Sequence, residues 1–289
     1  MQNRRNFLKQ ATLLLAGGAV MPQLLSSCGG PAKTIGLQLY SLRDLVKESG
    51  IETVLKTAAK IGYKNLETAG YDNGKIYGKS PAEFKKLVDD LGMKCTSAHL
   101  GRDFSKETEA EVMAWWDKAI EAHNELGVKY MVQPSMPVND QTTQEDLKLY
   151  CDYFTTVGMK TAAASIAFGY HNHSFEFRKI GDQLIYDFLL DNVSKNHVFF
   201  QMDVYWLTVG GGDPVAYLKA RPSQFRTIHI KDDKEIGASG KMDFQPIFEQ
   251  MKANNVKDWY VEVEQYTQND PVASVKESFD FLNKAAYVY

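Results

Sequence analysis

The sequence predicts a single (β/α)8 barrel, the TIM-barrel class of α/β fold. From residue 34 onward, eight short runs suited to β-strands alternate with longer helical patterns. Parallel strands need a crossover between them, and eight such units in about 260 residues fit a closed barrel. The rival is an open doubly wound sheet. That fold carries a glycine-rich phosphate turn after its first strand, where this chain has Leu39-Tyr40-Ser41-Leu42.

Clear start and stop signals bound the predicted elements. Strands are expected at 34–40, 65–69, 94–98, 130–133, 165–171, 198–204, 227–231 and 259–264. Helices are expected at 50–61, 81–91, 107–126, 144–164, 214–219, 245–253 and 271–285. A capping side chain followed by proline predicts helix starts at Ser80-Pro81, Asp213-Pro214 and Asp270-Pro271. Glycines that follow helical patterns predict helix ends at Gly62, Gly92 and Gly127.

The first 27 residues are interpreted as an export signal peptide. Arg4 and Arg5 precede an apolar stretch at 11–25, as in secretory signals, and resemble a twin-arginine signal. Leu25-Ser26-Ser27-Cys28 resembles a lipobox, whose cysteine carries the lipid. We expect cleavage before Cys28, a tether at 28–33 and a catalytic barrel at 34–289. The protein would then be exported to the periplasm as a lipoprotein, anchored to the membrane only through Cys28. A buried N-terminal helix is the alternative.

Composition and charge narrow the class of partner. Apolar residues make up 44% of the chain and charged residues 24%, which is ordinary for a soluble globular protein. The formal net charge is −3, and it falls by three, to −6, when the leader takes away Arg4, Arg5 and Lys9. Such a chain is unsuited to nucleic acid. Cys95 and Cys151 fall in a predicted strand and a predicted helix, so we expect two buried thiols and no disulfide.

Polar side chains gather at the predicted strand ends. Active sites of this fold lie at the carboxyl ends of the strands, and burying polar groups there is costly unless they pair or bind a cation. The residues at the strand ends are Glu67, His99, Gln133, His171 with His173, Asp203, His229 with Lys231, and Glu264. His123 lies on a predicted helix and is instead interpreted as an ordinary core or rim residue.

Four of these residues predict a metal site. His171, Asp203, His229 and Glu264 end predicted strands five to eight. Their mixed nitrogen and oxygen donors suit one divalent ion, Mn²⁺, Co²⁺, Zn²⁺ or Mg²⁺, and exclude a thiolate site. Residues two apart share a face of a strand, so His173 is an alternative ligand to His171. By the same spacing Glu262 shares the face of Glu264, and we expect it at the rim or behind the ligands.

The motifs resemble those of the xylose-isomerase-like TIM barrels over essentially the whole mature chain. That family includes sugar isomerases, ketose 3-epimerases, inositol-catabolism enzymes and endonuclease IV. Its sugar epimerases hold a metal through Glu, Asp, His and Glu from strands five to eight. The motifs that carry the resemblance are Gly169-Tyr170-His171-Asn172-His173, Asp203 with Trp206, His229-Ile230-Lys231-Asp232 and Val263-Glu264-Gln265.

Three positions depart from the patterns of the family. His171 stands where the epimerases have their first Glu, which questions epimerisation by two carboxylates. Glu176, five residues further on, is the candidate for a second carboxylate. Endonuclease IV needs a Glu and a His for its zinc ions, where this chain has Gln133 and Trp206, so a nuclease is not expected.

The resemblance implies a metal-dependent sugar isomerase or epimerase that removes an α-proton from a free sugar or keto-sugar. Glu264 is the expected base, with Glu176 and Lys231 as further catalytic candidates. The residues expected to bind substrate are Glu67, His99, His173 and Trp206, and the alternative role for Glu67 is to orient His99. A 3-keto-glycoside lyase and a non-catalytic carbohydrate-binding lipoprotein are the alternatives. The partner is a small carbohydrate, and the oligomeric state is open, with a homodimer as one option.

Overall fold

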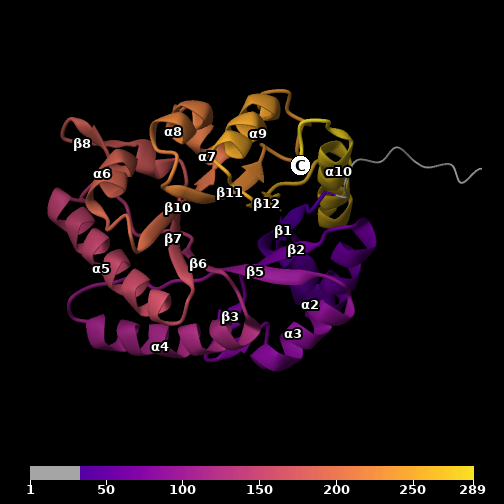
Figure 1. The fold of residues 1–289 in the computed structure, drawn as a ribbon, viewed down its shortest axis with the longest axis horizontal. Coiled ribbons are helices and arrows are strands. Elements are labelled where there is room, and N and C mark those ends of the chain that lie inside the picture. The colour runs from indigo at the N-terminus through magenta and orange to yellow at the C-terminus, as the bar shows by residue number, and fades with distance from the viewer. Residues whose placement is uncertain (1–32) are drawn as a thin grey trace, which may run out of the picture. The chain divides into compact units, whose positions relative to one another are not determined.

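The computed structural model describes residues 33–289, and the predicted leader, Cys28 and most of the tether lie outside them. Eight parallel strands close into one barrel in the order β1-β12-β11-β10-β7-β6-β5-β2, and helices surround it (Figure 1). This confirms the predicted fold class. The strands are β1 Gly36–Gln38, β2 Asn65–Thr68, β5 Lys94–His99, β6 Tyr130–Gln133, β7 Ala167–His171, β10 Val198–Asp203, β11 Phe225–Lys231 and β12 Asp258–Glu262.

The predicted helix starts at prolines are confirmed as capped N-termini. The Ser80 side chain accepts from the Glu83 backbone N–H, and Glu83 returns the bond in a capping box. Asp213 and Asp270 each cap a helix whose first turn holds proline. The helices are α2 Arg43–Ile61, α3 Pro81–Asp90, α4 Glu109–Leu126, α5 Gln144–Ala163, α6 Ile185–Asn192, α7 Val204–Val209, α8 Pro214–Ala220, α9 Phe244–Ala253 and α10 Pro271–Lys284.

One helix begins earlier than the sequence predicted, and several short elements were not predicted at all. Helix α2 begins seven residues earlier than expected and is broken at Gly50, whose φ of 78° is non-helical. Helices α6 and α7 have eight and six residues, too few for a helical period to show. The remaining short elements are the 3₁₀ turns η1 Leu39–Leu42 and η2 Phe175–Phe177 and the hairpins β3 Tyr71–Asp72 with β4 Lys75–Ile76 and β8 Lys179–Ile180 with β9 Gln183–Leu184.

The apolar core lies mainly between the barrel and its helices. Strand residues such as Leu66, Ile230 and Val261 are fully buried and belong to this core, as helix residues such as Phe154 and Phe248 do. Cys95 and Cys151 are buried free thiols, as predicted. Between residues 33 and 289, no helix has the length and apolar character that a membrane span requires.

The inside of the barrel, in contrast, carries many polar side chains. A β-bulge shifts the register between Leu66 and Glu67 of β2 against Cys95 and Ser97 of β5. Because a bulge puts an extra residue opposite one partner, both Thr96 and Ser97 hydrogen-bond to residues inside the barrel. The strands therefore deliver a buried polar layer that simple alternation would not produce.

Candidate active site

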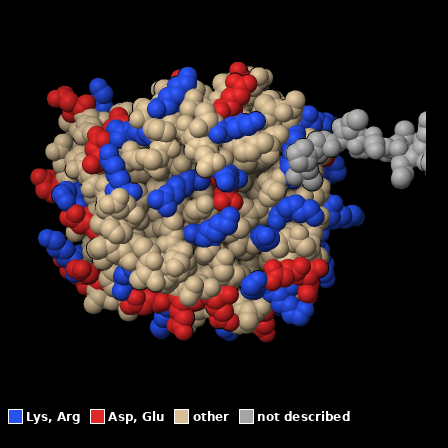
Figure 2. All heavy atoms as spheres, in the orientation of Figure 1, with Lys and Arg blue, Asp and Glu red and all other residues tan. Residues whose placement is uncertain are grey.

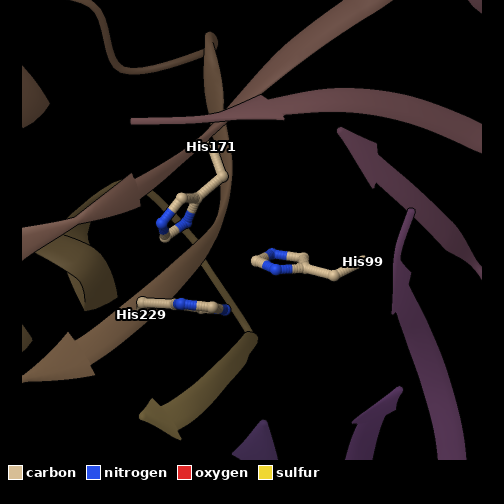
Figure 3. Close-up of side chains that lie close together, drawn as sticks. All are labelled: His99, His171 and His229. Carbon is tan, nitrogen blue, oxygen red and sulfur yellow. The ribbon is translucent and has the colours of Figure 1, made fainter. Parts of the chain in front are cut away.

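Three imidazoles meet inside the carboxyl end of the barrel. His99 and His171 are the last residues of β5 and β7, and His229 lies two residues before the end of β11. The ring centroids are 5.0 Å apart for His99 and His171, 4.9 Å for His99 and His229, and 4.6 Å for His171 and His229 (Figure 3). All three are at least 92% buried, since the most exposed of them, His99, has 8% of its surface accessible.

A second group, overlapping the first, has the composition of a metal site. Potential ligand atoms of His171, Asp203, His229 and Glu262 all lie within 4.8 Å of one another, and all four residues are buried. Three of the four predicted ligands are thus brought together, and Glu262 stands where Glu264 was expected. Glu262 pairs with Lys231 in the β11–β12 register and is the last residue of its strand. Glu264 lies one pleat further out.

Glu264 instead forms an ion pair at the mouth of the barrel. Its carboxylate lies 3.1 Å from Lys231 Nζ, and 24% of its side chain is exposed, against 2% for Lys231. The Lys231 ammonium also lies 5.5 Å from the centroid of the Trp206 ring and 5.8 Å from that of Tyr205. The outermost polar pair of the site is therefore a carboxylate and an ammonium beside two aromatic rings.

Asp203 provides a test of whether the cluster suits a cation. One of its carboxylate oxygens accepts from the Trp206 backbone N–H at 2.8 Å. The other, Oδ2, is buried and has no hydrogen-bond partner among residues 33–289. Burial raises the pKa of Asp203 to about 8, against the opposing charge of Lys231. A buried carboxylate oxygen without a donor is costly unless a cation or proton meets it, so the donor set fits a divalent metal.

His229 lies between two carboxylates. Its Nε2 is 2.5 Å from Glu67 Oε1, and its Nδ1 is 3.2 Å from Glu262 Oε2. Burial alone would lower the pKa of His229, but Glu262 and Glu67 outweigh it and raise the pKa to about 10. A second carboxylate on the far nitrogen is the arrangement that orients metal-ligating histidines in proteins.

Glu67 is the centre of a buried hydrogen-bond network rather than a wall of the cavity. It is fully buried and accepts from Gln38 Nε2 at 2.7 Å, Ser97 Oγ at 2.5 Å and Gln201 Nε2 at 2.8 Å. Burial opposes ionisation, but His99 and His229 outweigh it and lower the pKa of Glu67 to about 2. The expectation that Glu67 orients His99 agrees with a separation of 3.2 Å, while the expectation that it binds substrate does not agree with its burial.

An open cavity of about 320 Å³ lies over this cluster, within the size range of small-molecule sites. His99 and His173, both predicted to bind substrate, line it, whereas Trp206 is not among its lining residues. Trp206 instead lies 6.1 Å from His173, ring to ring. The lining residues are Tyr40, Ala69, His99, Pro134, Ser135, His171, His173, Glu262 and Glu264.

Glu176 does not reach this cavity. It is fully buried, and its two carboxylate oxygens accept from the Tyr170 hydroxyl at 2.6 Å and the His173 backbone N–H at 2.9 Å. Burial raises its pKa to about 7. Glu176 therefore ties the turn after β7 to the strand, a role that its spacing in the sequence did not reveal.

Sequence reasoning missed the amides that organise the site. Gln201 and Gln38 lie inside strands, and Asn172 follows β7 and bonds both the backbone N–H and the carbonyl of Asp203. The available signal was strand alternation. Gln201 is two residues before Asp203, so it shares the inward face of β10 with the metal-site aspartate.

Fold and site together define a (β/α)8 barrel with a polar, metal-compatible centre at the carboxyl ends of its strands. The chain belongs to the xylose isomerase-like TIM barrel family, whose model matches residues 55–285. Members of this family modify sugars and are often metal-dependent, and they include isomerases, epimerases and dehydratases.

Individual relatives differ in the reaction that they are named for. A solved structure from Parabacteroides distasonis, named a sugar phosphate isomerase/epimerase, is 37% identical, has a TM-score of 0.84, and covers 89% of this chain and 100% of its own. An inosose dehydratase of Clostridium beijerinckii is 24% identical over 87% of this chain and 92% of the relative. The 3-keto-D-glucoside 4-epimerase of E. coli, at 19% identity and a TM-score of 0.66, shares the fold and covers 88% of this chain and all of its own.

Proposed function

We propose that this protein is a divalent-metal-dependent isomerase or epimerase of a free sugar or keto-sugar, which acts by removing an α-proton. The observation that carries the proposal is the unpartnered Asp203 carboxylate oxygen, which lies among His171, His229 and Glu262 in the described part of the chain. Its family of sugar-modifying enzymes supports the substrate class.

These four residues would hold one divalent ion, and the mixed donors suit Mn²⁺, Co²⁺, Zn²⁺ or Mg²⁺. When bound, such an ion polarises a substrate carbonyl and stabilises the charge that develops as the neighbouring proton leaves. The Asn172 amide accepts from the Asp203 backbone N–H at 3.1 Å and donates to its carbonyl at 3.3 Å. These bonds position the backbone of Asp203, and the Trp206 N–H orients its carboxylate.

Glu264 is the residue best placed to act as the base. It lines the cavity and is partly exposed, and it is not one of the four clustered ligands, so its carboxylate is free to take a proton. Lys231 lies 3.1 Å from the Glu264 carboxylate, and this ion pair fixes the position of that carboxylate at the cavity. His99 and His173 also line the cavity and supply donors or acceptors for substrate hydroxyls.

The lining of the cavity favours an unphosphorylated substrate. Glu262 and Glu264 contribute carboxylates, and the lining residues found in the described chain include neither lysine nor arginine. Two cations lie beside the cavity, but Lys231 is paired with the Glu264 carboxylate and Arg43 donates to the backbone carbonyls of Tyr40 and Glu264. Phosphate binding calls for such cations or for a helix N-terminus. Tyr40, which is 45% exposed, lines the cavity, and the Arg43 guanidinium lies 4.6 Å from the centroid of its ring.

Elimination on the same scaffold is the second candidate, and a specific observation favours it. Epimerisation by two bases needs a second free carboxylate, but His171 takes the place of the strand-five glutamate, and both oxygens of Glu176 already accept hydrogen bonds. A single base, Glu264, is enough to remove the proton and let a β-substituent leave. The inosose dehydratases are lyases by name and match most of this chain.

Exchange of solvent deuterium into the substrate tests the proposal directly. With Mn²⁺ added, the wild type should exchange the α-proton of at least one member of a panel of ketoses, inososes and 3-keto-glycosides. NMR of the reaction products then shows whether the enzyme forms an isomer or an elimination product. Glu264→Gln should slow exchange at least 100-fold because it removes the base. Glu277→Gln, on the outer face of α10, is the matched control and should keep the wild-type rate. A wild type that binds sugars but exchanges no proton would be a carbohydrate-binding protein instead.

We also propose that the chain is exported and lipid-anchored at Cys28. The paired arginines, the apolar stretch and Leu25-Ser26-Ser27-Cys28 support this. Mass spectrometry of the protein purified from its own membranes should find a diacylated N-terminal Cys28. A mature chain that begins elsewhere, or a protein confined to the cytosol, would contradict it. Cys28→Ala should release the protein from the membrane fraction without changing its exchange rate.

The charged surface is consistent with a small-molecule partner. Figure 2 shows Lys and Arg side chains scattered over the face drawn there, with Asp and Glu side chains toward its edges. These basic side chains do not merge into the continuous basic surface that a polyanion requires.

A further inference from the structure

The polar side chains behind the metal-site histidines have hydrogen-bond directions that depend on one another. Glu67 accepts bonds from four residues, and one of these, Gln201, faces two of the histidines with its other end. We propose that Glu67, acting through Gln201, sets which ring nitrogen of His171 and of His229 carries the proton, so that each presents a bare nitrogen to Asp203 and Glu262. This positioning role rests on the proposed function, because it matters for binding a metal.

The direction of the Gln38 amide anchors the network. Gln38 Oε1 accepts from the Tyr40 backbone N–H at 2.9 Å, so its Nε2 must be the atom that faces Glu67, at 2.7 Å. Oε1 of Glu67 is therefore an acceptor. The nitrogen of His229 that lies 2.5 Å from the same oxygen, Nε2, must then carry a proton. A histidine must be neutral to bind a metal, and in that form His229 has a bare Nδ1, which lies 3.2 Å from Glu262 Oε2.

The second oxygen of Glu67 fixes the direction of Gln201. Oε2 lies 2.8 Å from the Gln201 side chain, and a carboxylate only accepts, so Gln201 must turn its NH₂ toward Glu67. Its carbonyl Oε1 then faces His99 Nε2 at 2.5 Å and His171 Nδ1 at 3.2 Å. Both of these nitrogens must be donors. His171 consequently keeps Nε2 bare as its ligand atom.

The consequence is a specific effect of one substitution. In Glu67→Gln, Gln38 still donates to the Oε1 position, so the new amide places its oxygen there and its NH₂ toward Gln201. Gln201 must then turn its carbonyl to residue 67 and its NH₂ to both His99 and His171. The proton of His171 moves to Nε2, the ligand nitrogen, while His229 keeps its proton on Nε2. A loss of packing alone would not invert one histidine and spare the other.

Nitrogen-15 NMR of labelled histidines reads these tautomers, first in the metal-free protein. In the wild type we expect protonated Nδ1 on His171, and in Glu67→Gln protonated Nε2 on His171 with Nε2 of His229 still protonated. Gln201→Met removes the hydrogen-bonded link from Glu67 to His171, which we call the relay, without adding a charge. In this variant the proton of His171 should lose its strong preference for Nδ1. Thr96→Val, a buried isosteric change in the same barrel that contacts Asn65 and Tyr260, should leave both histidines as in the wild type.

Zn²⁺ titration against a chromophoric chelator gives an independent readout. Glu67→Gln should weaken Zn²⁺ binding about 10- to 100-fold, the usual cost of losing a partner behind a metal-ligating histidine, and Thr96→Val should not. A wild type that binds Zn²⁺, with His171 unchanged in Glu67→Gln, would overturn the relay and leave the proposed function standing. A wild type that shows the expected tautomers but binds none of Zn²⁺, Mn²⁺ and Co²⁺ would support the relay. The same result would refute the metal-dependent function.

Discussion

Glu67 and Asp203 are both fully buried carboxylates at the centre of one barrel, yet their surroundings differ in kind. Four residues donate to Glu67, and burial of the charge is compensated. Asp203 has one donor, and its second oxygen meets no partner within residues 33–289. The first carboxylate is therefore built to orient its neighbours, and the second to receive a cation.

Asp203→Asn should separate stability from metal binding. Burial disfavours the charged carboxylate of Asp203, so replacing it with a neutral amide should leave the metal-free protein at least as stable as the wild type. Zn²⁺ at about 100 times its Kd should add about 2.7 kcal/mol to the unfolding free energy of the wild type and nothing to the variant. Thermal unfolding at a fixed scan rate measures both. Asp258→Asn, at the opposite end of the barrel, should keep the zinc-induced shift, and a zinc shift retained by Asp203→Asn would refute its role as a ligand.

His123 makes stability depend on pH away from the site. Its Nδ1 bonds to the Ala119 carbonyl at 2.7 Å, its Nε2 is buried without a partner in the described chain, and burial lowers its pKa to about 4. As pH falls below about 6.5 the unfolded chain takes up a proton that the folded chain refuses, so stability is lost as pH falls toward 4.

The expected size of this effect is about 2 kcal/mol between pH 7 and pH 5. His123→Phe keeps an aromatic ring beside Tyr71, whose ring centroid lies 5.1 Å from that of His123, and removes the titration. Urea unfolding at pH 5, 6 and 7 should show a smaller loss of stability in the variant. An equal loss in both proteins would assign the pH dependence to other groups.

Individual elements were predicted well where their signals are local. The Ser80 capping box and the proline that follows it fix the start of α3 from a few adjacent residues. Glu262 and Glu264 show the limit of local reasoning. They share a face by alternation, but β12 ends at Glu262, and the register with β11 pairs Glu262 with Lys231 and leaves Glu264 beyond the end of the strand.

Ser80→Ala should lower the unfolding free energy by about 1 kcal/mol because it removes the cap of α3. The control on the same helix is Lys86→Ala, which loses only an exposed i,i+4 pair with Asp90 and should cost about 0.5 kcal/mol or less. Denaturant unfolding of the two variants provides the comparison. If both substitutions lower the unfolding free energy equally, the capping box contributes no more to stability than a surface ion pair.

Closure of the barrel depends on a backbone contact between its first and last strands. Gly36 in β1 pairs with Tyr260 in β12, and a Cβ at Gly36 would clash with the Trp259 carbonyl oxygen. Both strands belong to the closed sheet, so neither can move away freely. The absence of a side chain at this one position lets the eighth strand join the first.

Gly36→Ala should therefore destabilise the whole barrel by about 3 kcal/mol, the upper range for overpacking. Gly78→Ala is the matched control. Gly78 has a φ of 78° and open space around it, so the cost there is only about 1–2 kcal/mol of left-handed strain. Unfolding midpoints in denaturant measure both variants. A Gly36→Ala protein as stable as Gly78→Ala would mean that the strands can separate without loss.

The barrel, the order of its strands and the residues at their carboxyl ends could be predicted from the sequence alone, because hydrophobic period, caps and strand ends are properties of neighbouring residues. Which of these residues contact one another depends on how the strands pack in three dimensions. Depth in the barrel depends on register between strands distant in sequence, so Glu262 joined the histidines and Glu264 did not. The same packing buried Glu176 beneath its turn and placed Gln201 against the rings of His99 and His171, and no local sequence pattern predicts these contacts.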